Sequence, residues 1–371
     1  MRGRMHIVHV VGARPNFIKA APVLDALSNW DSVSQVLVHT GQHYDSTLSE
    51  VFFKELDISE PDVNLEVGSG SHAVQTALIM MRLEEVLLKR KPNLVLVYGD
   101  VNSTVAAALV CSKLLITVGH VEAGLRSFDR TMPEEINRIL TDHICDFLFT
   151  PSGDGDANLI REGVAPEKIH RVGNVMIDTL VQLQELVAHK WTSNRICREY
   201  FGSHGQTNNN YALVTLHRPS NVDNPEMLVR IMITLEEISD DVPILFPVHP
   251  RTREYLKKIR FETHNPRLCL TGPVGYLDFL SFQKNAKLVI TDSGGIQEET
   301  TYLGVPCLTL RANTERPVTV EVGTNLLVGQ DMDRLKVEVY RIMSGQAKQG
   351  SIPPLWDGKA GERIARAILQ A

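Results

Sequence analysis

The clearest signal of fold in this 371-residue chain is the segment Lys287-Leu-Val-Ile-Thr-Asp-Ser-Gly-Gly-Ile-Gln-Glu-Glu-Thr300. Residues 288–290 are apolar and predict a strand, whereas residues 296–303 have the spacing of a helix. A strand that passes through Gly294-Gly295 into a helix directs unpaired N–H groups and the positive end of the helix dipole toward one point. Because glycine lets an anion approach the backbone and Ser293 adds a hydroxyl, the segment fits either a phosphate site or an ordinary capped helix start.

Most of the chain repeats this alternation of strand-like and helix-like segments. Continuous apolar runs are typical of parallel strands that helices cover on both faces. We expect strands at 6–11, 35–38, 94–98, 116–121, 147–150, 169–172, 212–215, 244–248, 268–270, 288–290 and 307–310. We expect helices at 16–27, 72–89, 103–114, 225–239, 276–284, 296–303 and 358–369. The predicted fold class is α/β, with two doubly wound, Rossmann-like parallel-sheet domains that face a cleft and bind ligand at the carboxyl ends of their strands.

The length of the chain exceeds one ordinary hydrophobic core, so two domains are expected. The first is expected at 1–173 and the second at 174–356, with the hinge at Gly173-Asn174. The polar run His204–Asn210 is expected to be a surface loop. The final segment, 357–371, is expected to form a helix that can pack back on the first domain.

Composition restricts the class of protein. The hydrophobic content of 43% and the charged content of 22% are those of a soluble globular protein. The net charge of −6, without a cluster of Lys and Arg, argues against a nucleic-acid partner. The apolar run after Arg2 and Arg4 stops at Gly12, which is too short for a signal peptide, and no apolar stretch is long enough to span a bilayer. We therefore expect a cytoplasmic protein with no membrane partner.

The cysteines and glycines argue against bound metals and common cofactors. An odd number of scattered cysteines without metal-ligand spacing is typical of buried free thiols in a reducing compartment. Neither a Walker sequence nor Gly-x-Gly-x-x-Gly is present, and no pair of His or Cys has metal-ligand spacing. We therefore expect no cofactor and no metal. The five cysteines are Cys111, Cys145, Cys197, Cys269 and Cys307.

Polar residues concentrate at the ends of predicted strands in the first half. Arg14 follows the first strand and Lys19 lies about one helical turn later, a placement that suits binding of a diphosphate or carboxylate. Surface positions at an ordinary helix start explain the same two residues equally well. Asp100 follows the strand at 94–98, where a turn or capping role is the more common explanation.

Two further acids complete a set of three carboxylates in the first half. Glu122 ends a buried apolar strand, and because an unpaired buried carboxylate is costly, a functional role is the better explanation. Glu134 and Arg138 stand four residues apart on one helix face, either as a plain salt bridge or as a pair of site residues.

The second half contributes histidines and a cation. His217 and His249 each follow a predicted strand. Either one alone is more often structural than catalytic, but two in equivalent strand-end positions favour a functional site. Arg316 follows another strand and adds a positive charge. The second half therefore combines cations with the helix-start anion site at Ser293.

Six motifs in collinear order resemble those of the non-hydrolysing UDP-N-acetylglucosamine 2-epimerases, over essentially the whole chain. They are Gly12-x-Arg14-Pro15, Gly99-Asp100, His120-Val-Glu-Ala-Gly-Leu-Arg126, Pro133-Glu-Glu-x-Asn-Arg138, Asp292-Ser-Gly-Gly-Ile-Gln-Glu-Glu299 and Thr314-Glu-Arg-Pro317. The resemblance implies the glycosyltransferase-B-type fold, with UDP held mainly by the C-terminal domain and the catalytic acids in the N-terminal domain. It also implies interconversion of UDP-N-acetylglucosamine (UDP-GlcNAc) and UDP-N-acetylmannosamine (UDP-ManNAc) for a cell-surface polysaccharide pathway. We further expect a homodimer.

The family is understood to eliminate UDP across C1–C2, leaving 2-acetamidoglucal, and to add UDP back with the proton on the other face. This requires a base, an acid for the opposite face and stabilisation of the departing diphosphate. By resemblance, the catalytic residues are Asp100, Glu122, Glu134 and His217. By resemblance, the substrate-binding residues are Arg14, Lys19, Arg138, His249, Ser293, Gly294, Gly295, Glu299 and Arg316. Glu299 is implied to accept hydrogen bonds from the ribose hydroxyls, and the sequence does not assign the base and the acid among the three carboxylates.

The chain departs from many bacterial members of that family in three places. Those members follow the His217 motif with Arg-Glu, where this chain has Pro219-Ser-Asn221. They carry a second Gln where this chain has Asp45, and an arginine that is absent from Gly68-Ser-Gly-Ser-His72. These positions resemble the family's regulatory second UDP-sugar site, which His249 also matches. We therefore expect that activity does not require priming by UDP-GlcNAc.

Other functions fit the same residues. A hydrolysing relative would release free N-acetylmannosamine and UDP, and a relative of different specificity would act on an oxidised, deoxygenated or diacetamido UDP-sugar. A glycosyltransferase shares the fold, but it needs an acceptor groove where this chain places acids. A non-catalytic sugar-nucleotide sensor is disfavoured because all three acids are present.

Overall fold

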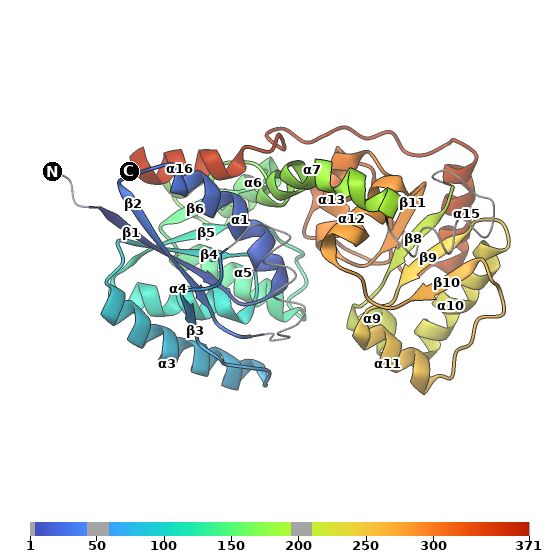
Figure 1. The fold of residues 1–371 in the computed structure, drawn as a ribbon, viewed down its shortest axis with the longest axis horizontal. Coiled ribbons are helices and arrows are strands. Elements are labelled where there is room, and N and C mark those ends of the chain that lie inside the picture. The colour runs from blue at the N-terminus through green and yellow to red at the C-terminus, as the bar shows by residue number, and fades with distance from the viewer. Residues whose placement is uncertain (1–3, 43–58, 194–209, 371) are drawn as a thin grey trace. The chain divides into compact units, whose positions relative to one another are not determined.

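The computed structural model describes residues 4–42, 59–193 and 210–370 (Figure 1). It divides into two compact units. One unit comprises Met1–Gln182 and Pro354–Ala371, and the other comprises Leu183–Pro353. The division falls inside helix α7 (Val175–Ser193). Of the expected polar loop, residues 204–209 lie outside the described residues.

The first unit is built on a parallel sheet with the strand order β3-β2-β1-β4-β5-β6-β7. Its strands are β1 (Met5–Val11), β2 (Val33–His39), β3 (Val63–Asn64), β4 (Leu94–Tyr98), β5 (Thr117–Val121), β6 (Phe147–Thr150) and β7 (Ile169–Arg171). Its helices, besides α7, are α1 (Arg14–Ser28), α3 (His72–Arg90), α4 (Asn102–Leu114), α5 (Pro133–Ile144), α6 (Gly153–Arg161), the 3-10 turn η1 (Pro166–Lys168) and α16 (Ala360–Gln370). Every residue of β4 is buried, which is why the central strands read as continuous apolar runs.

The second unit has a parallel sheet with the strand order β10-β9-β8-β11-β12-β13. Its strands are β8 (Ala212–Thr215), β9 (Ile244–Pro247), β10 (Leu268–Thr271), β11 (Leu288–Thr291), β12 (Cys307–Thr309) and β13 (Asn325–Leu327). Its helices are α9 (Pro219–Val222), α10 (Pro225–Ser239), α11 (Pro250–Lys258), α12 (Tyr276–Asn285), α13 (Gly294–Leu303), α14 (Pro317–Glu321) and α15 (Met332–Met343). The predicted fold class, two α/β domains each with a parallel sheet, is confirmed.

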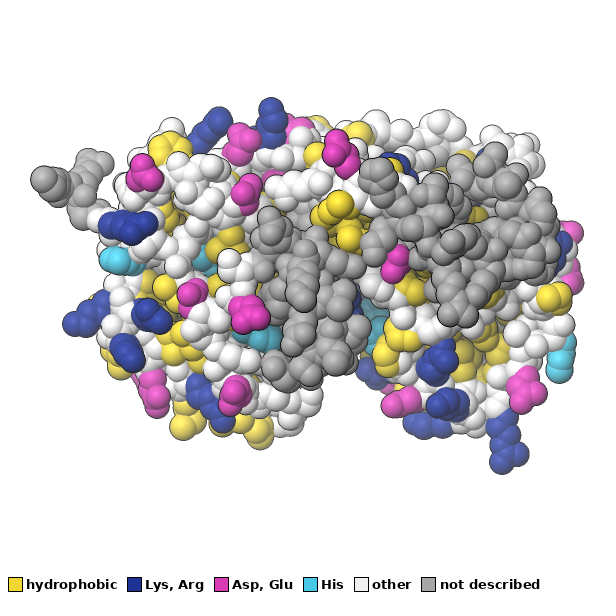
Figure 2. Space-filling view, in the orientation of Figure 1, with side chains coloured by type: hydrophobic (Ala, Val, Ile, Leu, Met, Phe, Trp, Pro, Cys, Tyr) yellow, Lys and Arg dark blue, Asp and Glu magenta, His cyan; other side chains and the backbone are white. Residues whose placement is uncertain are grey.

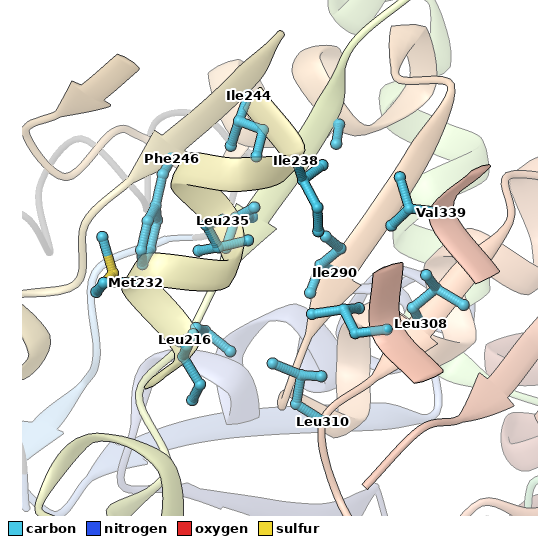
Figure 3. Packing of buried hydrophobic residues seen from close by; sticks show 14 of the residues in the cluster. Leu216, Met232, Leu235, Ile238, Ile244, Phe246, Ile290, Leu308, Leu310 and Val339 are labelled. Carbon is cyan, nitrogen blue, oxygen red and sulfur yellow. The ribbon is translucent and has the colours of Figure 1, made fainter. Parts of the chain in front are cut away.

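The core of the second unit fixes the central strands that carry the candidate site. Leu235 and Ile238 of α10 pack with Ile290 of β11, Leu308 of β12 and Val339 of α15 (Figure 3). Each buried aliphatic side chain of this size contributes about 1.5–3 kcal/mol. These helices therefore hold β11 and its neighbours, and with them the turns that follow the strands.

A proline in α1 determines how three helices of the first unit meet. Pro22 has no N–H, so it cannot donate to the carbonyl of Ile18. That carbonyl instead accepts a hydrogen bond of 2.6 Å from the hydroxyl of Thr179 in α7. The adjacent Asp178 accepts a hydrogen bond of 2.7 Å from the amide of Gly361 in α16. A side chain at Gly361 would overlap the backbone of α1, so the C-terminal helix packs closely on the first unit (Figure 1).

Gly173, expected at a hinge, is required by a close approach of two chain segments. Its φ of 91° lies in the left-handed region, and a side chain here would overlap the carbonyl of Leu355. Asn174 accepts a hydrogen bond of 2.9 Å from the amide of Met176, in the first turn of α7. Both residues of the expected hinge lie within the first compact unit.

Each sheet has a point at which the strand order reverses, between β1 and β4 in the first unit and between β8 and β11 in the second. Loops that follow the strands at such a point are where doubly wound sheets bind ligands. Arg14, Asp100, His217 and Ser293 follow these four strands. The topology therefore places predicted site residues from both halves at the binding edge of their own sheet.

The surface is of mixed charge. Figure 2 shows acidic and basic side chains interspersed on the visible face, with basic ones gathered over α11. Lys257 and Lys258 lie in the last turn of this helix, where they complement the negative end of its dipole. Among the helices that the structure describes, none has both the length and the apolar character needed to cross a membrane.

Candidate functional site

The predicted polar site residues of the first unit lie around the turn that follows β4. Gly99 has a φ of 64° and donates its amide to the carbonyl of Val121 at 3.1 Å. A Cβ at Gly99 would lie 2.8 Å from Lys19 Nζ. Only glycine fits this position without strain. The turn thus brings α1, β4 and β5 together at one point.

A buried ion pair joins α1 to the end of β5. Lys19 Nζ lies 2.7 Å from Glu122 Oε2, and the side chains are 7% and 3% exposed. The surface alternative for Lys19 is therefore excluded. Glu122 has a φ of 77°, a left-handed conformation that non-glycine residues rarely adopt. Such strain costs on the order of 1–3 kcal/mol and is typical of functional sites.

Asp100 is held by helix α5. Arg138 binds Asp100 Oδ2 through one guanidinium nitrogen and Glu135 Oε2, at 2.6 Å, through another. Asn137 donates a hydrogen bond of 2.9 Å to the backbone carbonyl of Asp100. The N-cap residue of α4 is Val101, so Asp100 directly precedes the cap position. The salt bridge considered for Glu134 is not the one observed on this helix, and Glu134 lies half-buried in the first turn of α5.

A second layer of charged residues lies behind these acids and was not predicted from the sequence. His120, in β5, is completely buried between Asp142 Oδ1 at 2.7 Å and the carbonyl of Gly99 at 2.8 Å. Asp142 Oδ2 accepts hydrogen bonds from Arg126 at 2.7 Å and from the amide of Gly124 at 3.1 Å. Burial opposes ionisation, but His120 and Arg126 hold the pKa of Asp142 below its ordinary value. A histidine inside an otherwise apolar strand is the sequence signal that points to this layer.

In the second unit, Asp292 organises the turn after β8. Its carboxylate is completely buried and accepts hydrogen bonds of 2.9 to 3.1 Å from the amides of His217 and Arg218 and from the side chain of Asn221. His217 Nδ1 lies 3.1 Å from Asp292 Oδ1. Burial opposes ionisation, but these donors, His217 first among them, hold the pKa of Asp292 below its ordinary value. The ionised carboxylate engages Nδ1 of His217, so Nε2 is the nitrogen that can face a ligand.

Two predicted residues occupy more exposed positions. His249 is the N-terminal cap of α11, where Nδ1 accepts a hydrogen bond of 3.2 Å from the amide of Arg251. Its ring centre lies 5.5 Å from that of His217, so the two predicted histidines lie together. Arg14 is the exposed first residue of α1.

The start of α13 has the components of an anion site. Ser293 occupies the N-cap position, but its side chain makes no capping hydrogen bond, so the capping explanation for this serine is wrong. The guanidinium of Arg316 lies directly over Gly294, where a side chain would overlap it. Glu298 at 3.0 Å and Glu315 bind this buried guanidinium. The first amides of a helix, a hydroxyl and a fixed cation therefore converge, which suits a phosphate group.

If the α13 start binds UDP, as the family resemblance implies, Gly294→Ala is expected to weaken UDP binding by about 10–100-fold, because the added methyl displaces the Arg316 guanidinium and a charge-assisted hydrogen bond is worth roughly 1.5–3 kcal/mol. Alanine otherwise favours helix over glycine by about 1 kcal/mol, so a weakened helix would not explain the loss. Titration calorimetry with UDP measures the effect. Gly272→Ala is the matched control, since no heavy atom lies within 4 Å of its Cβ position. An unchanged affinity in Gly294→Ala would exclude this arrangement from UDP binding.

Glu299 lies on the second turn of α13 and is 2% exposed. Its Oε1 accepts a hydrogen bond of 2.8 Å from the hydroxyl of Tyr276. Burial, with a smaller contribution from Glu298, raises the pKa of Glu299 from 4.5 to about 7. Its protonation state therefore changes near neutral pH, which makes this carboxyl group sensitive to any ligand that donates hydrogen bonds to it.

The loop after β2 is bound to α4 by hydrogen bonds. Gln42 Oε1 accepts hydrogen bonds from the amide and the hydroxyl of Ser103, at 3.1 and 2.7 Å. Asn102 donates a hydrogen bond of 2.8 Å to Gln75. These side chains bind neighbouring segments and do not cap α4. Residues 43–45, which include the departure at Asp45, lie outside the described residues.

The described part of the chain contains no group of three or more His, Cys, Asp or Glu side chains that could hold a metal ion. The described cysteines are free thiols. Cys111, Cys145 and Cys307 are buried as expected, whereas Cys269 is partly exposed. Cys197 lies outside the described residues.

Comparison with known proteins adds to this geometry. The protein-family model for UDP-N-acetylglucosamine 2-epimerase matches residues 25–369. The UDP-N-acetylglucosamine 2-epimerase of Methanocaldococcus jannaschii is 46% identical over 98% of this chain and 99% of its own length. The UDP-2,3-diacetamido-2,3-dideoxy-D-glucuronate 2-epimerase of Pseudomonas aeruginosa is 42% identical over 99% of this chain and all of its own length.

A solved structure shares the fold over the whole length. The crystal structure of the Methanocaldococcus jannaschii UDP-GlcNAc 2-epimerase in complex with UDP-GlcNAc and UDP has a TM-score of 0.89 and 45% sequence identity. The match covers 99% of this chain and 100% of that one. Both compact units thus have counterparts in that protein.

Proposed function

Since the chain belongs to the UDP-N-acetylglucosamine 2-epimerase family, we propose that it interconverts UDP-GlcNAc and UDP-ManNAc without hydrolysing them. The observation that carries the proposal is the buried Lys19–Glu122 pair beside the Asp100–Arg138 pair. Two carboxylates, each with its own cation, lie at one sheet edge. Removal of a proton from one face of a carbon and its return to the other face needs two groups whose protonation is controlled separately.

The proposed reaction is elimination followed by re-addition. C2 of the sugar is not next to a ring carbonyl, so simple enolisation is not available to invert it. A carboxylate removes the C2 proton, the electron pair forms a C1–C2 double bond, and the C1–O bond breaks with its electrons passing to UDP. Addition of UDP at C1 and of a proton at C2 from the opposite face gives the epimer. Glu122, Asp100 and Glu134 are the groups that share the acid and base roles.

The second unit is proposed to hold the leaving group. The start of α13 and Arg316 would stabilise the charge that develops on the diphosphate, which is the largest electrostatic demand of the elimination. Glu299 would accept hydrogen bonds from the ribose hydroxyls. His217, oriented by Asp292, would offer Nε2 to the diphosphate or the sugar. The first unit then carries out the proton transfers.

Incubation with UDP-GlcNAc in deuterated water, followed by NMR, tests the proposal. Deuterium at C2 of both UDP-linked epimers is the expected result. Release of free hexosamine and UDP would instead identify a hydrolysing enzyme. Absence of both exchange and hydrolysis would exclude UDP-GlcNAc as the substrate.

A second candidate substrate is a diacetamido UDP-sugar acid. It is favoured by the 42% identity to the Pseudomonas aeruginosa enzyme named for UDP-2,3-diacetamido-2,3-dideoxy-D-glucuronate. The same C2 chemistry serves both substrates, so the three acids do not distinguish them. Measurement of kcat/KM for both UDP-sugars distinguishes the two candidates. If kcat/KM is more than about 100 times higher for the diacetamido sugar, that sugar and not UDP-GlcNAc is the substrate.

We expect the reverse reaction to start without a lag and to follow a hyperbolic rate curve with UDP-ManNAc alone. The reason is that residues of the related regulatory site are replaced in this chain, as at Asp45 and at 68–72. Initial rates are measured with UDP-ManNAc freed of UDP-GlcNAc. A sigmoidal curve that trace UDP-GlcNAc converts to a hyperbola would contradict this expectation.

The proposal also covers the oligomeric state of the protein and the reaction that consumes its product. We propose a homodimer, which sedimentation velocity tests. The product keeps UDP as a leaving group, so it suits a following step that transfers the sugar to a cell-surface polysaccharide.

A further inference from the structure

We propose that His120 is a positioning residue for the catalytic acids and that it acts as an imidazolium ion. Its ring nitrogens lie 2.7 Å from Asp142 Oδ1 and 2.8 Å from the carbonyl oxygen of Gly99. A carboxylate and a carbonyl only accept hydrogen bonds. A neutral imidazole has one N–H, so its second nitrogen would present a lone pair to an acceptor. Two N–H donors satisfy both contacts.

The hydrogen bonds around Asp142 place the shared proton on His120. Asp142 Oδ2 already accepts from Arg126 at 2.7 Å and from the amide of Gly124 at 3.1 Å, and both donors favour the carboxylate over the acid. Arg126 also pairs with Glu162 at 2.7 Å. Two cations and two anions therefore form one balanced cluster, which allows a charged imidazole to remain buried.

This cluster fixes the two turns that carry acids. The amide of Gly99 donates to Val121 and its carbonyl accepts from His120, so the residue directly before Asp100 is held on both sides. Asp142 binds the amide of Gly124, two residues after Glu122. His120 and Asp142 therefore connect the Asp100 turn to the Glu122 turn. Displacement of a reacting group by about 1 Å can cost on the order of 100-fold in rate.

Two substitutions of His120 each remove a different one of its two hydrogen bonds. Their effect is measured on C2 exchange, so this test rests on the proposed function. The side-chain nitrogen of Asn replaces Nδ1, so His120→Asn keeps the bond to Asp142 and loses the bond to Gly99. The longer Gln side chain reaches the position of Nε2, so His120→Gln keeps the bond to Gly99. We expect His120→Asn to lower kcat for C2 exchange by about 100-fold, with KM within about threefold, and His120→Gln to retain at least about ten times more activity. Equal rates in the two variants, or rates that follow only their thermal stability, would overturn the positioning role.

His9 provides the matched control in the same sheet. It is also completely buried, and burial lowers the pKa of His9 to about 3, so its ring is neutral at pH 7. His9→Gln is expected to leave kcat for C2 exchange within about threefold of wild type. This result would show that replacing a buried histidine in this sheet does not by itself lower kcat.

Nitrogen NMR of histidine-labelled wild-type protein at pH 7 tests the imidazolium directly. We expect two protonated ring nitrogens for His120 and one unprotonated nitrogen for His9. One unprotonated nitrogen in His120 would overturn the assignment. The spectrum does not depend on turnover, so a wild-type protein that fails to exchange C2 would refute the proposed function while the imidazolium assignment is still tested.

Discussion

Glu122→Gln is expected to lower the rate of deuterium exchange at C2 by about 10²–10⁴-fold, while UDP affinity changes by less than about threefold. Glutamine keeps the shape of the side chain but cannot take up the C2 proton. The proposed UDP-binding groups, at the start of α13 and at Arg316, belong to the other unit. Loss of exchange without loss of UDP binding is therefore the signature of a proton-transfer group.

The substitution also leaves Lys19 without its carboxylate in a buried site, and breaking a buried pair costs about 3–5 kcal/mol. Thermal unfolding is measured in parallel, and Glu122→Asp keeps the charge while moving it by one methylene. Glu84→Gln, at an exposed position of α3, is the control for removal of a carboxylate elsewhere in the unit. A folded Glu122→Gln protein with near-wild-type exchange would remove Glu122 from the mechanism.

Much of the fold could be predicted because parallel strands are apolar on both faces. The strand expected at 94–98 is β4 and the one at 212–215 is β8, with the same bounds. Elements that lack this signature were missed. β13 has three residues, and α11 buries only Thr252 and Leu256, so neither gives a periodic apolar pattern.

The candidate site could be located but not assembled from the sequence. Residues that follow the strands of one parallel sheet share one edge of that sheet, so the sequence points to Asp100 and Glu122 in the first unit and to His217 in the second. Their partners could not be predicted, because Arg138 reaches Asp100 across 38 positions and Asp142 reaches His120 across 22. No local spacing encodes such contacts.

Local spacing was also misleading where several acids were available. The four-residue interval between Glu134 and Arg138 fits a helix salt bridge, yet the observed partner on that helix is Glu135. Glu135 also accepts hydrogen bonds from the amides of Ser127 and Phe128 at 3.0 and 2.8 Å. The preceding loop therefore holds the Glu135 carboxylate in place. Arg138 pairs with this fixed carboxylate and also with Asp100.

Glu299→Gln is expected to weaken uridine binding by about 10–100-fold at pH 8, because a hydrogen bond to a charged acceptor is worth roughly 1.5–3 kcal/mol. In the proposed site the ribose hydroxyls would donate to the ionised carboxylate, and burial raises the pKa of Glu299 to about 7. The wild-type affinity for uridine should therefore rise as the pH increases from 5 to 8, whereas the affinity of the variant should not depend on pH. Uridine is used rather than UDP because a terminal phosphate titrates near pH 6.

Glu299→Gln should also raise the free energy of unfolding of the second unit at alkaline pH. A carboxyl group whose pKa is higher in the folded protein costs no stability below its unfolded pKa, because it is then protonated in both states. The free energy of unfolding falls as the pH rises from the unfolded pKa to the folded pKa, because the unfolded chain ionises first. For Glu299 this interval runs from 4.5 to about 7, and at about 1.36 kcal/mol per pH unit it amounts to roughly 3 kcal/mol. Glu299→Gln should therefore be more stable than wild type at pH 8, with the advantage disappearing below pH 4.5.

Amide hydrogen exchange in β11, followed between pH 4 and pH 9, measures this local stability in the second unit. Glu254→Gln, at an exposed position of α11, is the control and should follow the wild-type profile. A gain in stability together with a loss of uridine affinity would mean that the carboxylate is kept buried for its ligand and at the expense of the fold. A variant that loses stability at pH 8 would show that Glu299 serves the fold through Tyr276 instead.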